Sequence, residues 1–264
     1  MPIELGSVST LWRYPVKSML GEEVNSAEVT VRGLLGDRAY AVIDEADGKA
    51  ASAKNPRKWP RLFEFAATLI GPARVRITLP DGATVTSDQH DLDAKLSQAL
   101  DRQVRFRAAA QGVVQAEEYW PDVEGLAHRN TVSDFVLPEG TFFDGATVHL
   151  VTTSTLGRLH ELYPQGRFEV PRFRPNIVVE MTSGEQGFAE NAWVGRMLTI
   201  GSDVRLNVTG LCGRCVMTTL AQGDLPGDLG ILRAVAQHNH ANVGVYAAVV
   251  QSGEIRRGDT VRLE

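Results

Sequence analysis

Both cysteines of the chain lie in one stretch, Asn207-Val208-Thr209-Gly210-Leu211-Cys212-Gly213-Arg214-Cys215-Val216-Met217-Thr218-Thr219. The residues 204–208 alternate between apolar and polar side chains, and the residues 216–220 are rich in β-branched side chains. Both patterns are typical of strands. Gly210 and Gly213 allow the tight backbone of a turn. The sequence therefore predicts two strands joined by a short bend that holds both cysteines.

The Cys212-x-x-Cys215 spacing is compatible with four structures. A zinc site needs two more ligands, and His238 and His240 would have to supply them in a spacing that is not typical of zinc. A thioredoxin-like pair opens a helix, whereas a strand is predicted to follow here. Two small buried core residues are a third possibility. The fourth is a single thiolate at Cys215, favoured by the cation of Arg214 and bound to a metal whose other ligands come from a cofactor.

The composition is that of an ordinary globular protein. The chain has 264 residues, of which 43% are hydrophobic and 22% are charged, enough for one large domain or two moderate ones. Its net charge of -5 argues against binding to nucleic acid or to an anionic membrane surface. A ligand that carries phosphate would therefore have to be bound by a local group of basic residues.

The N-terminal residues 1–6 do not resemble a signal sequence, because they lack a basic region followed by an apolar one. No apolar run reaches the length of a membrane span. Two closely spaced cysteines do not make a disulfide framework, which agrees with a reducing compartment. We therefore expect a cytoplasmic protein.

Short strands separated by turns dominate the first part of the chain. One helix is predicted after Ser87 from the spacing of its leucines. The periodicity fades between residues 108 and 130, so we place the junction of two domains there, with residues 1–115 in the first domain and residues 116–264 in the second. The strands predicted in the first domain are 8–14, 23–31, 39–44, 63–70, 74–79, 83–86 and 104–106.

The second domain is also predicted to be mainly β. One helix is expected to begin after Thr152, and another covers residues 228–237. The fold class is therefore mainly β with a few helices (α+β). The strands predicted in this domain are 131–137, 147–151, 177–180, 204–208, 216–220, 242–250 and 254–263.

Several polar residues could bind an anion, and each has a purely structural alternative. Lys17 and Ser18 lie in a loop, where they could simply be solvated. Arg38 precedes a strand, where it could form a structural ion pair. Thr153 and Ser154 begin a helix whose N-terminal amides suit an anion, but their hydroxyls could serve only as caps.

Two arginines, Arg172 and Arg174, precede a predicted strand. Pro175 is expected to hold Arg174 in extended backbone. The planar guanidinium group suits phosphate or dithiolene-like anions, and one of the two arginines is expected in a surface ion pair. The basic, proline-containing loop 53–61 is expected to be a solvated connector.

Together these motifs resemble a known family. Tyr14-Pro15-Val16-Lys17-Ser18 and Gly36-Asp37-Arg38 are similar to the N-terminal β-barrel domain found before MOSC domains. Four motifs later in the chain resemble the MOSC domain itself. Within the family the chain is most similar to the mitochondrial amidoxime-reducing component and its bacterial relatives. The four motifs are Phe173-Arg174-Pro175-Asn176-Ile177-Val178, Phe188-Ala189-Glu190-Asn191-Ala192-Trp193, Cys212-Gly213-Arg214-Cys215-Val216-Met217-Thr218-Thr219 and Gly258-Asp259-Thr260-Val261.

The resemblance implies an N-terminal MOSC-type β-barrel domain followed by a MOSC β-barrel domain, with a molybdenum cofactor of the molybdopterin type held between them. By this resemblance Cys215, and not Cys212, is the protein ligand to molybdenum. Asp144 is implied to be an acid near the metal. The residues implied to hold the cofactor are Lys17, Ser18, Arg38, Thr153, Ser154, Arg174, Asn176 and Arg214.

The activity that the resemblance implies is that of a molybdenum-dependent oxidoreductase, which reduces N-hydroxylated small molecules while Asp144 relays protons. Because Glu264 follows the last predicted strand directly, we expect the electrons to come from a separate ferredoxin, flavoprotein or cytochrome. Neither nucleic acid nor a membrane is an expected partner.

Three other functions stay open on the sequence. Cys215 could carry a persulfide, as in sulfur carriers of the sulfurase kind. The chain could bind or deliver the molybdenum cofactor without turnover. Some MOSC proteins are also associated with pyridoxal phosphate, and here Lys17 is the one lysine that we can nominate for a Schiff base.

Overall fold

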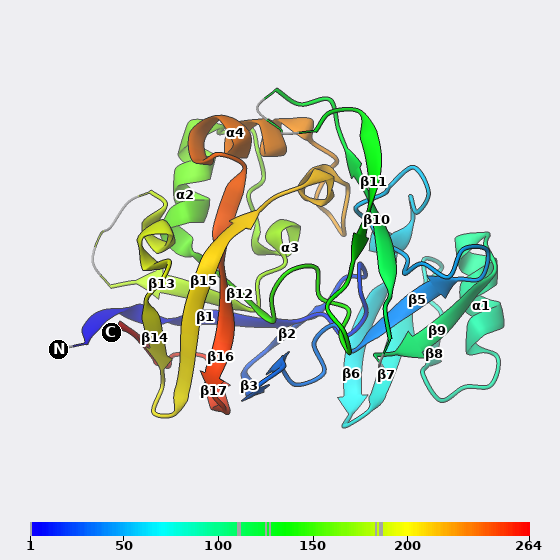
Figure 1. The fold of residues 1–264 in the computed structure, drawn as a ribbon, viewed down its shortest axis with the longest axis horizontal. Helices are drawn as coiled ribbons and strands as arrows, with labels where there is room; N and C mark the ends of the chain where they lie inside the picture. Colours follow the sequence, from blue (N-terminus) through cyan, green and yellow to red (C-terminus); the bar gives the residue numbers. More distant parts are fainter. Residues whose placement is uncertain (1, 110–111, 125, 127, 183, 185–186) are drawn as a thin grey trace.

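The computed structural model describes residues 2–109, 112–124, 126, 128–182, 184 and 187–264. Within these residues the chain forms many short strands and four α-helices (Figure 1). The predicted fold class, mainly β with a few helices, is confirmed. No helix in the described residues is long and apolar enough to cross a membrane.

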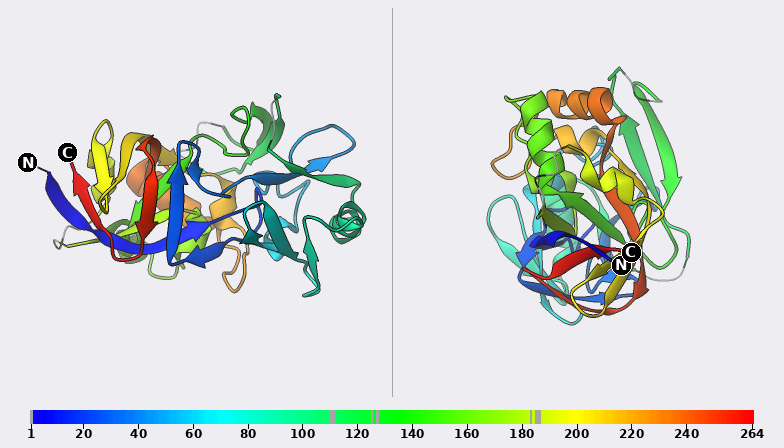
Figure 2. Two further views of the ribbon diagram at one scale, coloured as in Figure 1. Left: turned by 90° about the horizontal axis from the view of Figure 1, so that it is seen from below. Right: turned by 90° about the vertical axis from the view of Figure 1, so that its left-hand side faces the viewer.

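A closed barrel of seven strands forms one end of the molecule. Its strand order is β13-β12-β16-β15-β14-β18-β1, and the barrel closes because β1 pairs with β13 as well as with β18. The two termini lie side by side at this end, as both views in Figure 2 show. The strands are β1 (Ile3–Arg13), β12 (Val148–Thr152), β13 (Ile177–Met181), β14 (Met197–Ile200), β15 (Val204–Gly213), β16 (Asn242–Gln251) and β18 (Thr260–Leu263).

The first strand of the chain thus completes a barrel whose other strands all come from the C-terminal part of the chain. Its inward residues Leu5, Val8 and Leu11 are buried in the barrel core. Gly6 is required where β1 crosses β13, because a Cβ atom there would lie 1.9 Å from the carbonyl oxygen of Glu180. The division into residues 1–115 and 116–264 stays a prediction.

A second unit with its own apolar core lies at the other end of the molecule. Its core includes Phe65, Ile77 and Leu96, and Met217 from the cysteine stretch packs into it. Its elements are β5 (Tyr40–Asp44), η1 (Leu62–Glu64), β6 (Ala66–Gly71), β7 (Arg74–Thr78), β8 (Thr84–Thr86), α1 (Leu92–Leu100) and β9 (Val104–Ala108). The strands β2 (Glu22–Val24), β3 (Ser26–Thr30), β4 (Gly33–Leu34) and β17 (Gly253–Arg256) pack against the barrel instead. There β2 pairs with β1 and β17 pairs with β3, and the barrel core includes Ala27, Val29, Leu34 and Ile255.

Helices cover one side of the barrel, at the top of Figure 1. Helices α2 and α4 pack against each other, and their apolar side chains form a third cluster with Phe173 and Val178 (Figure 1). The N-terminus of α2 is capped by Thr152, whose hydroxyl accepts a hydrogen bond from the Thr155 N–H. These elements are α2 (Thr153–Leu162), α3 (Val170–Phe173), η2 (Ala189–Trp193) and α4 (Leu229–Asn239).

The stretch after the cysteines is not a strand, so this prediction is wrong. Residues Val216–Thr219 form a 3-10 helix, η3. The hydroxyls of Thr218 and Thr219 donate hydrogen bonds to the carbonyl oxygens of Cys215 and Val216. Such local bonds from threonine compete with a strand ladder, which the β-branched composition alone does not reveal.

A hairpin, β10 (Gln115–Trp120) with β11 (Thr131–Val136), occupies part of the region in which no period was found. It stands beside the junction of the barrel and the N-terminal unit (Figure 1). The alternation in β10 was hidden because Glu117 and Glu118 point toward lysines instead of solvent. A strand that carries such paired charged side chains therefore has the same polar sequence pattern as a solvated loop.

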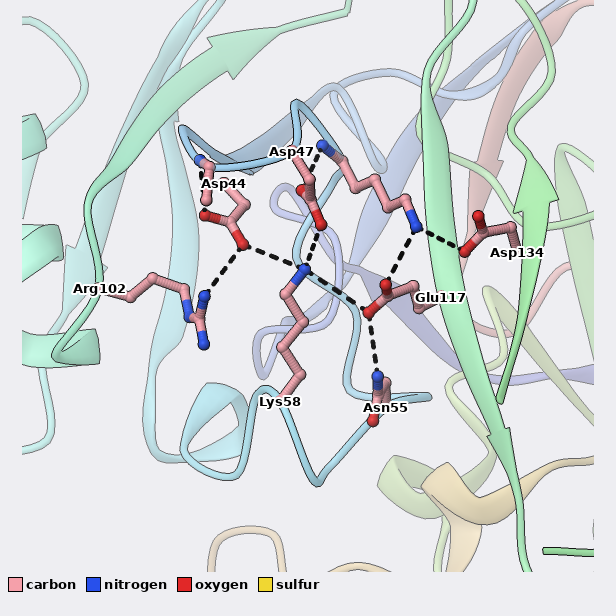
Figure 3. A network of polar contacts seen from close by, with 9 residues as sticks. Asp44, Asp47, Asn55, Lys58, Arg102, Glu117 and Asp134 are labelled. Carbon is pink, nitrogen blue, oxygen red and sulfur yellow. Dashed lines mark hydrogen bonds and ion pairs between the residues drawn. The ribbon is translucent and has the colours of Figure 1, made fainter. Parts of the chain in front are cut away.

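The network in Figure 3 holds this hairpin to the N-terminal unit. Lys58 Nζ lies 3.1 Å from Asp44, 2.6 Å from Asp47 and 3.6 Å from Glu117. Glu117 also accepts a hydrogen bond of 3.0 Å from Asn55 Nδ2. Asp44 is almost fully buried, and the cations that pair with it are Lys58 and Arg102, whose Nη1 lies 3.3 Å away.

We predict that Lys58→Met lowers the free energy of unfolding by about 2 kcal/mol, because it leaves partly buried carboxylates without their shared cation. Urea denaturation measures this. Lys95→Met is the matched control, since its ion pair with Asp91 is exposed and should contribute less than about 0.5 kcal/mol. Equal stability of both variants would show that the network does not hold the hairpin.

Candidate functional site

One pocket brings together eight of the ten predicted site residues. It lies where the barrel, the N-terminal unit and the loop 142–146 meet. The pocket is also lined by Lys54, His149 and Tyr246, which no sequence motif indicated as site residues. The eight predicted residues are Lys17, Ser18, Arg38, Asp144, Arg174, Asn176, Arg214 and Cys215.

The loop after β1 places Lys17 and Ser18 in the pocket wall. Both side chains are almost fully buried. Lys17 Nζ donates a hydrogen bond of 3.2 Å to the Phe142 carbonyl oxygen and forms an ion pair with Asp144. The Ser18 hydroxyl accepts a hydrogen bond of 3.0 Å from the Ala53 N–H, which fixes the loop that carries Lys54. The alternative of a solvated loop is therefore wrong.

Asp37 lies behind the pocket wall and binds residues from three separate segments of the chain. Its buried carboxylate accepts hydrogen bonds of 2.7 Å from the Tyr14 N–H and 3.0 Å from Asn176 Nδ2, and it pairs with Arg38. Arg38 Nη2 in turn donates to the Arg174 carbonyl oxygen at 3.1 Å. This single carboxylate therefore fixes β1, the loop before β5 and the start of β13 relative to one another.

Arg174 does not have the extended backbone that was predicted from Pro175. Its φ of 53° and ψ of 46° are left-handed, and its N–H closes α3 by bonding the Val170 carbonyl oxygen. The guanidinium lies 4.2 Å from the centre of the Tyr14 ring and donates to the Met19 carbonyl oxygen. Burial, together with the charge of Arg38, lowers the pKa of Arg174 to about 10.

Arg172 was expected to be a candidate for a surface ion pair, but it is fully buried. It binds four backbone carbonyl oxygens instead. The acceptors are Arg167 at 2.6 Å, Thr218 and Leu220 at 3.2 Å, and Pro226 at 2.7 Å. Three of them belong to the segment that follows Cys215, so Arg172 fixes the backbone next to that thiol.

The two cysteines have different surroundings. Cys212 is fully buried in β15, and its Sγ accepts a hydrogen bond of 2.7 Å from Arg214 Nη1. Burial alone would raise the pKa of Cys212, but Arg214 and then His149 outweigh it and lower the pKa to about 6. Cys215 follows the strand and faces the pocket.

Arg214 lowers the pKa of Cys215, as predicted, but this effect is not large enough to make Cys215 a thiolate. Burial raises the pKa of Cys215 to about 11, and the nearby cations Lys54 and Arg214 offset only part of this rise. Arg214 is directed elsewhere, since its second Nη donates to the Phe173 carbonyl oxygen at 2.8 Å. Cys215 is therefore a neutral thiol at pH 7 until a ligand stabilises its thiolate.

Asp144 lies at the mouth of the pocket, with 32% of its side chain exposed. Burial would raise the pKa of Asp144, but the ammonium groups of Lys17 and Lys54 outweigh it and hold the pKa well below the usual range. Asp144 is therefore ionised at pH 7. It can accept hydrogen bonds or a proton, but it does not hold a proton to donate.

The pocket has an excess of positive charge. Five cations line it, and Asp144 is the single carboxylate among the lining residues that are described. Even when Asp37, Glu118 and a thiolate at Cys212 behind the wall are counted, positive charge is left over. Buried charges need partners, so the pocket suits an anionic ligand. The five cations are Lys17, Arg38, Lys54, Arg174 and Arg214.

Thr153 and Ser154 are not brought to this pocket. They begin α2, where the Ser154 hydroxyl donates to the Gly187 carbonyl oxygen at 3.0 Å. The neighbouring Thr152 and Thr155 hydroxyls both donate to Glu190 at 2.6 Å. Their part in cofactor binding stays a prediction. No cluster of three His, Cys, Asp or Glu side chains suited to a metal occurs in the described residues, so the zinc alternative has no support.

Comparison with known families accounts for both parts of the chain. Residues 5–121 match the model of the MOSC N-terminal beta barrel domain, and residues 138–262 match the model of the MOSC domain. The chain belongs to the MOSC family. This confirms the family that the sequence motifs indicated.

Relatives with known names support the same assignment. Mitochondrial amidoxime reducing component 2 of Rattus norvegicus is 30% identical over 82% of this chain and 67% of its own length. Molybdenum cofactor sulfurase of Danio rerio is 25% identical over 92% of this chain and 32% of its own length. The crystal structure of the YUAD protein from Bacillus subtilis has a TM-score of 0.51 at 12% identity and covers 100% of this MOSC chain and 98% of its own, which supports the fold alone.

We predict that Arg172→Met lowers the free energy of unfolding by about 3 kcal/mol, because four backbone carbonyl groups around this fully buried side chain lose their donor. Chemical denaturation gives the size of the loss. Hydrogen exchange should accelerate first in residues 216–226. Arg172→Lys should recover only part of the stability, since an ammonium group cannot reach all four acceptors. Unchanged exchange in that segment would contradict the anchoring role.

A second prediction concerns Cys212. In a Cys215→Ser variant, the ultraviolet absorbance of the thiolate should be present at pH 7 and disappear as the pH falls through about 6. The folded pKa lies below the unfolded value of about 8.5. The stability that this thiolate contributes is therefore complete above the unfolded value and lost as the pH falls through about 6. Absorbance that appears only above the unfolded pKa would refute the pairing with Arg214.

Proposed function

We propose that this MOSC protein is a molybdenum cofactor-dependent oxidoreductase that reduces N-hydroxylated small molecules. The observation that carries the proposal is a single thiol, Cys215, facing a pocket with five cations and one carboxylate. A soft sulfur ligand and an excess of positive charge match a metal held by dithiolene sulfurs on a pterin with a phosphate tail. The similarity to amidoxime reducing components supports the same choice.

The pocket residues match both parts of this cofactor, the metal and the anionic pterin. Cys215 would be the protein ligand to the metal. Four cations would bind the anionic cofactor, namely Lys17, Arg38, Arg174 and Arg214. Each donates a hydrogen bond to a backbone carbonyl, so its position in the pocket wall is fixed before the cofactor binds. The polar groups of Ser18 and Asn176 are held in the wall by bonds to Ala53, His149 and Asp37.

The chemistry supplied by the bound group would be a two-electron reduction at the metal. The protein positions the substrate and handles protons. Asp144 is ionised and partly exposed, so it can orient a water molecule or a substrate N–H at the mouth by accepting a hydrogen bond. A proton relay through Asp144 would require the bound ligand to draw Lys17 or Lys54 away from it, because these two cations lower its pKa. Phe142, Phe143 and Met217 are buried, and they limit the entry of water into the depth of the pocket.

Electrons would come from a separate ferredoxin, flavoprotein or cytochrome, and the expected cytoplasmic location remains a prediction. A second candidate function is sulfur transfer through a persulfide on Cys215, which the similarity to molybdenum cofactor sulfurase favours. Binding or delivery of the cofactor without turnover is also compatible with the pocket. For pyridoxal phosphate, Lys17 would have to leave its ion pair with Asp144 before it could form a Schiff base.

We predict that Cys215→Ser, produced in a host that makes the pterin, folds normally but loses reductase turnover by more than about a hundredfold, because a direct ligand matters more than the residues behind it. Metal analysis and turnover of an amidoxime with a chemical electron donor measure this. Cys212→Ala is the matched control and should retain molybdenum and measurable turnover. A wild-type protein with cyanide-labile sulfur and no molybdenum would instead support the sulfur carrier.

A further inference from the structure

Lys54 is the one cation in the pocket wall that is held by side chains alone among the described residues. Its Nζ lies 3.5 Å from Asp144 Oδ2 and 3.6 Å from Glu118 Oε1, and 15% of its side chain is exposed. The ring of Phe135, from the hairpin, is centred 4.6 Å from the same nitrogen. Two of these groups, Glu118 and Phe135, come from the hairpin, and the third, Asp144, lines the pocket together with Lys54.

The backbone of Lys54 is fixed even though its ammonium group is not. Its carbonyl oxygen accepts a hydrogen bond of 2.7 Å from the Tyr119 N–H of β10. Its own N–H donates to the Ser52 hydroxyl at 3.2 Å. Four residues later, Lys58 anchors the same loop in the network of Figure 3. The ammonium group is therefore presented to the pocket from a rigid loop.

The hydrogen bonds of this ammonium are incomplete in the described residues. An ammonium group has three donors. Both carboxylate distances exceed the usual hydrogen-bond length of about 2.7 to 3.2 Å. The other four pocket cations differ, since Lys17, Arg38, Arg174 and Arg214 each donate to a backbone carbonyl in the wall. Lys54 therefore keeps a donor for a ligand atom that reaches the pocket from the mouth.

We propose that Lys54 binds the oxygen atom of the substrate and makes the site prefer substrates whose oxygen is anionic or strongly polarised, such as hydroxamates and N-oxides. This rests on the proposed reductase function, because it names the group that the same site recognises. Asp144 and Glu118 hold the ammonium in place, and Tyr246 lies with it in the lining of the pocket. A compact lysine cation suits a single oxygen atom better than a planar arginine does.

The first test needs no cofactor and no turnover. In cofactor-free protein, alkylation of Cys215 by anionic iodoacetate is compared with alkylation by neutral iodoacetamide. Trypsin separates the cysteines, because cleavage after Arg205, Arg214 and Arg233 places Cys212 in residues 206–214 and Cys215 in residues 215–233. The ratio of the two rates reports the charge beside Cys215, and any change in thiolate fraction cancels.

We expect Lys54→Met to lower this ratio about fivefold, since a nearby positive charge that attracts the anionic reagent is lost. Lys54→Arg should keep most of the ratio. Lys95→Met, on an exposed face of α1, removes one lysine elsewhere and should leave the ratio unchanged. An unchanged ratio in Lys54→Met would overturn the placement of this charge at the reacting end of the pocket.

The second test uses the molybdenum-loaded enzyme. Lys54→Met should retain the wild-type molybdenum content, because Lys54 does not belong to the cofactor-binding group. At an alkaline pH where the hydroxamic acid is ionised, its KM for benzohydroxamate should rise about tenfold, the loss expected for a hydrogen bond to a charged oxygen. The KM for benzamidoxime, which stays neutral at that pH, should rise less. Lys54→Arg should recover part of the preference.

The outcomes separate this inference from the proposed function. If wild-type loaded enzyme reduces both compounds and Lys54→Met raises both KM values equally or neither, the substrate role of Lys54 is refuted while the reductase function stands. If Lys54→Met loses molybdenum, Lys54 serves the cofactor and the inference is also refuted. If the wild-type protein reduces neither compound, the reductase function falls, whatever the alkylation ratio shows.

Discussion

The pocket is constrained above all by its unbalanced charge. Five cations surround one thiol, and the nearby carboxylates balance only three of them. The lowered pKa of Arg174, caused by burial and then by Arg38, is a direct sign of the cost of this arrangement. Without a ligand the protein loses stability at this site, so binding of an anion and stability of the fold must be coupled.

The surrounding structure holds these repelling groups together. Asp37 ties three separate segments to one carboxylate, and backbone carbonyl groups take up donors of the arginines. The barrel supports this arrangement, because β1 leads directly from the barrel core to the loop with Lys17 and Ser18. A shift in the pairing of β1 with β13 would therefore move pocket residues on both strands at once.

The sequence predicts six of the seven barrel strands and misses only β14, since alternation is a local signal. Eight pocket residues were found through short motifs that resemble the family. Lys54 and Arg172 were misplaced because their roles depend on partners distant in the chain. Lys54 lies in a basic, proline-containing loop that resembles a solvated connector, and its carboxylates come from β10 and from the loop before β12. Arg172 has no carboxylate partner that a pattern could suggest, because its acceptors are backbone carbonyls. At η3 the hydroxyls of Thr218 and Thr219 bond the neighbouring backbone, and these local bonds outweigh the strand propensity of the segment.

The two cysteines of this short motif differ in role, since Cys212 binds Arg214 and Cys215 faces the pocket. Arg214 lies between them in sequence, yet its guanidinium donates hydrogen bonds to Cys212 and to the Phe173 carbonyl oxygen, and not to Cys215. The thiolate of Cys212 therefore orients the guanidinium of Arg214, which also lines the pocket. Cys215 remains a neutral thiol with a raised pKa, so its thiolate becomes stable only when a strong Lewis acid or other ligand binds it. A thiol in this state reacts more slowly with oxidants and alkylating reagents than its thiolate would. The Cys212-x-x-Cys215 spacing places Arg214 where it binds the first sulfur directly, while the second sulfur keeps its bonding capacity for a ligand in the pocket.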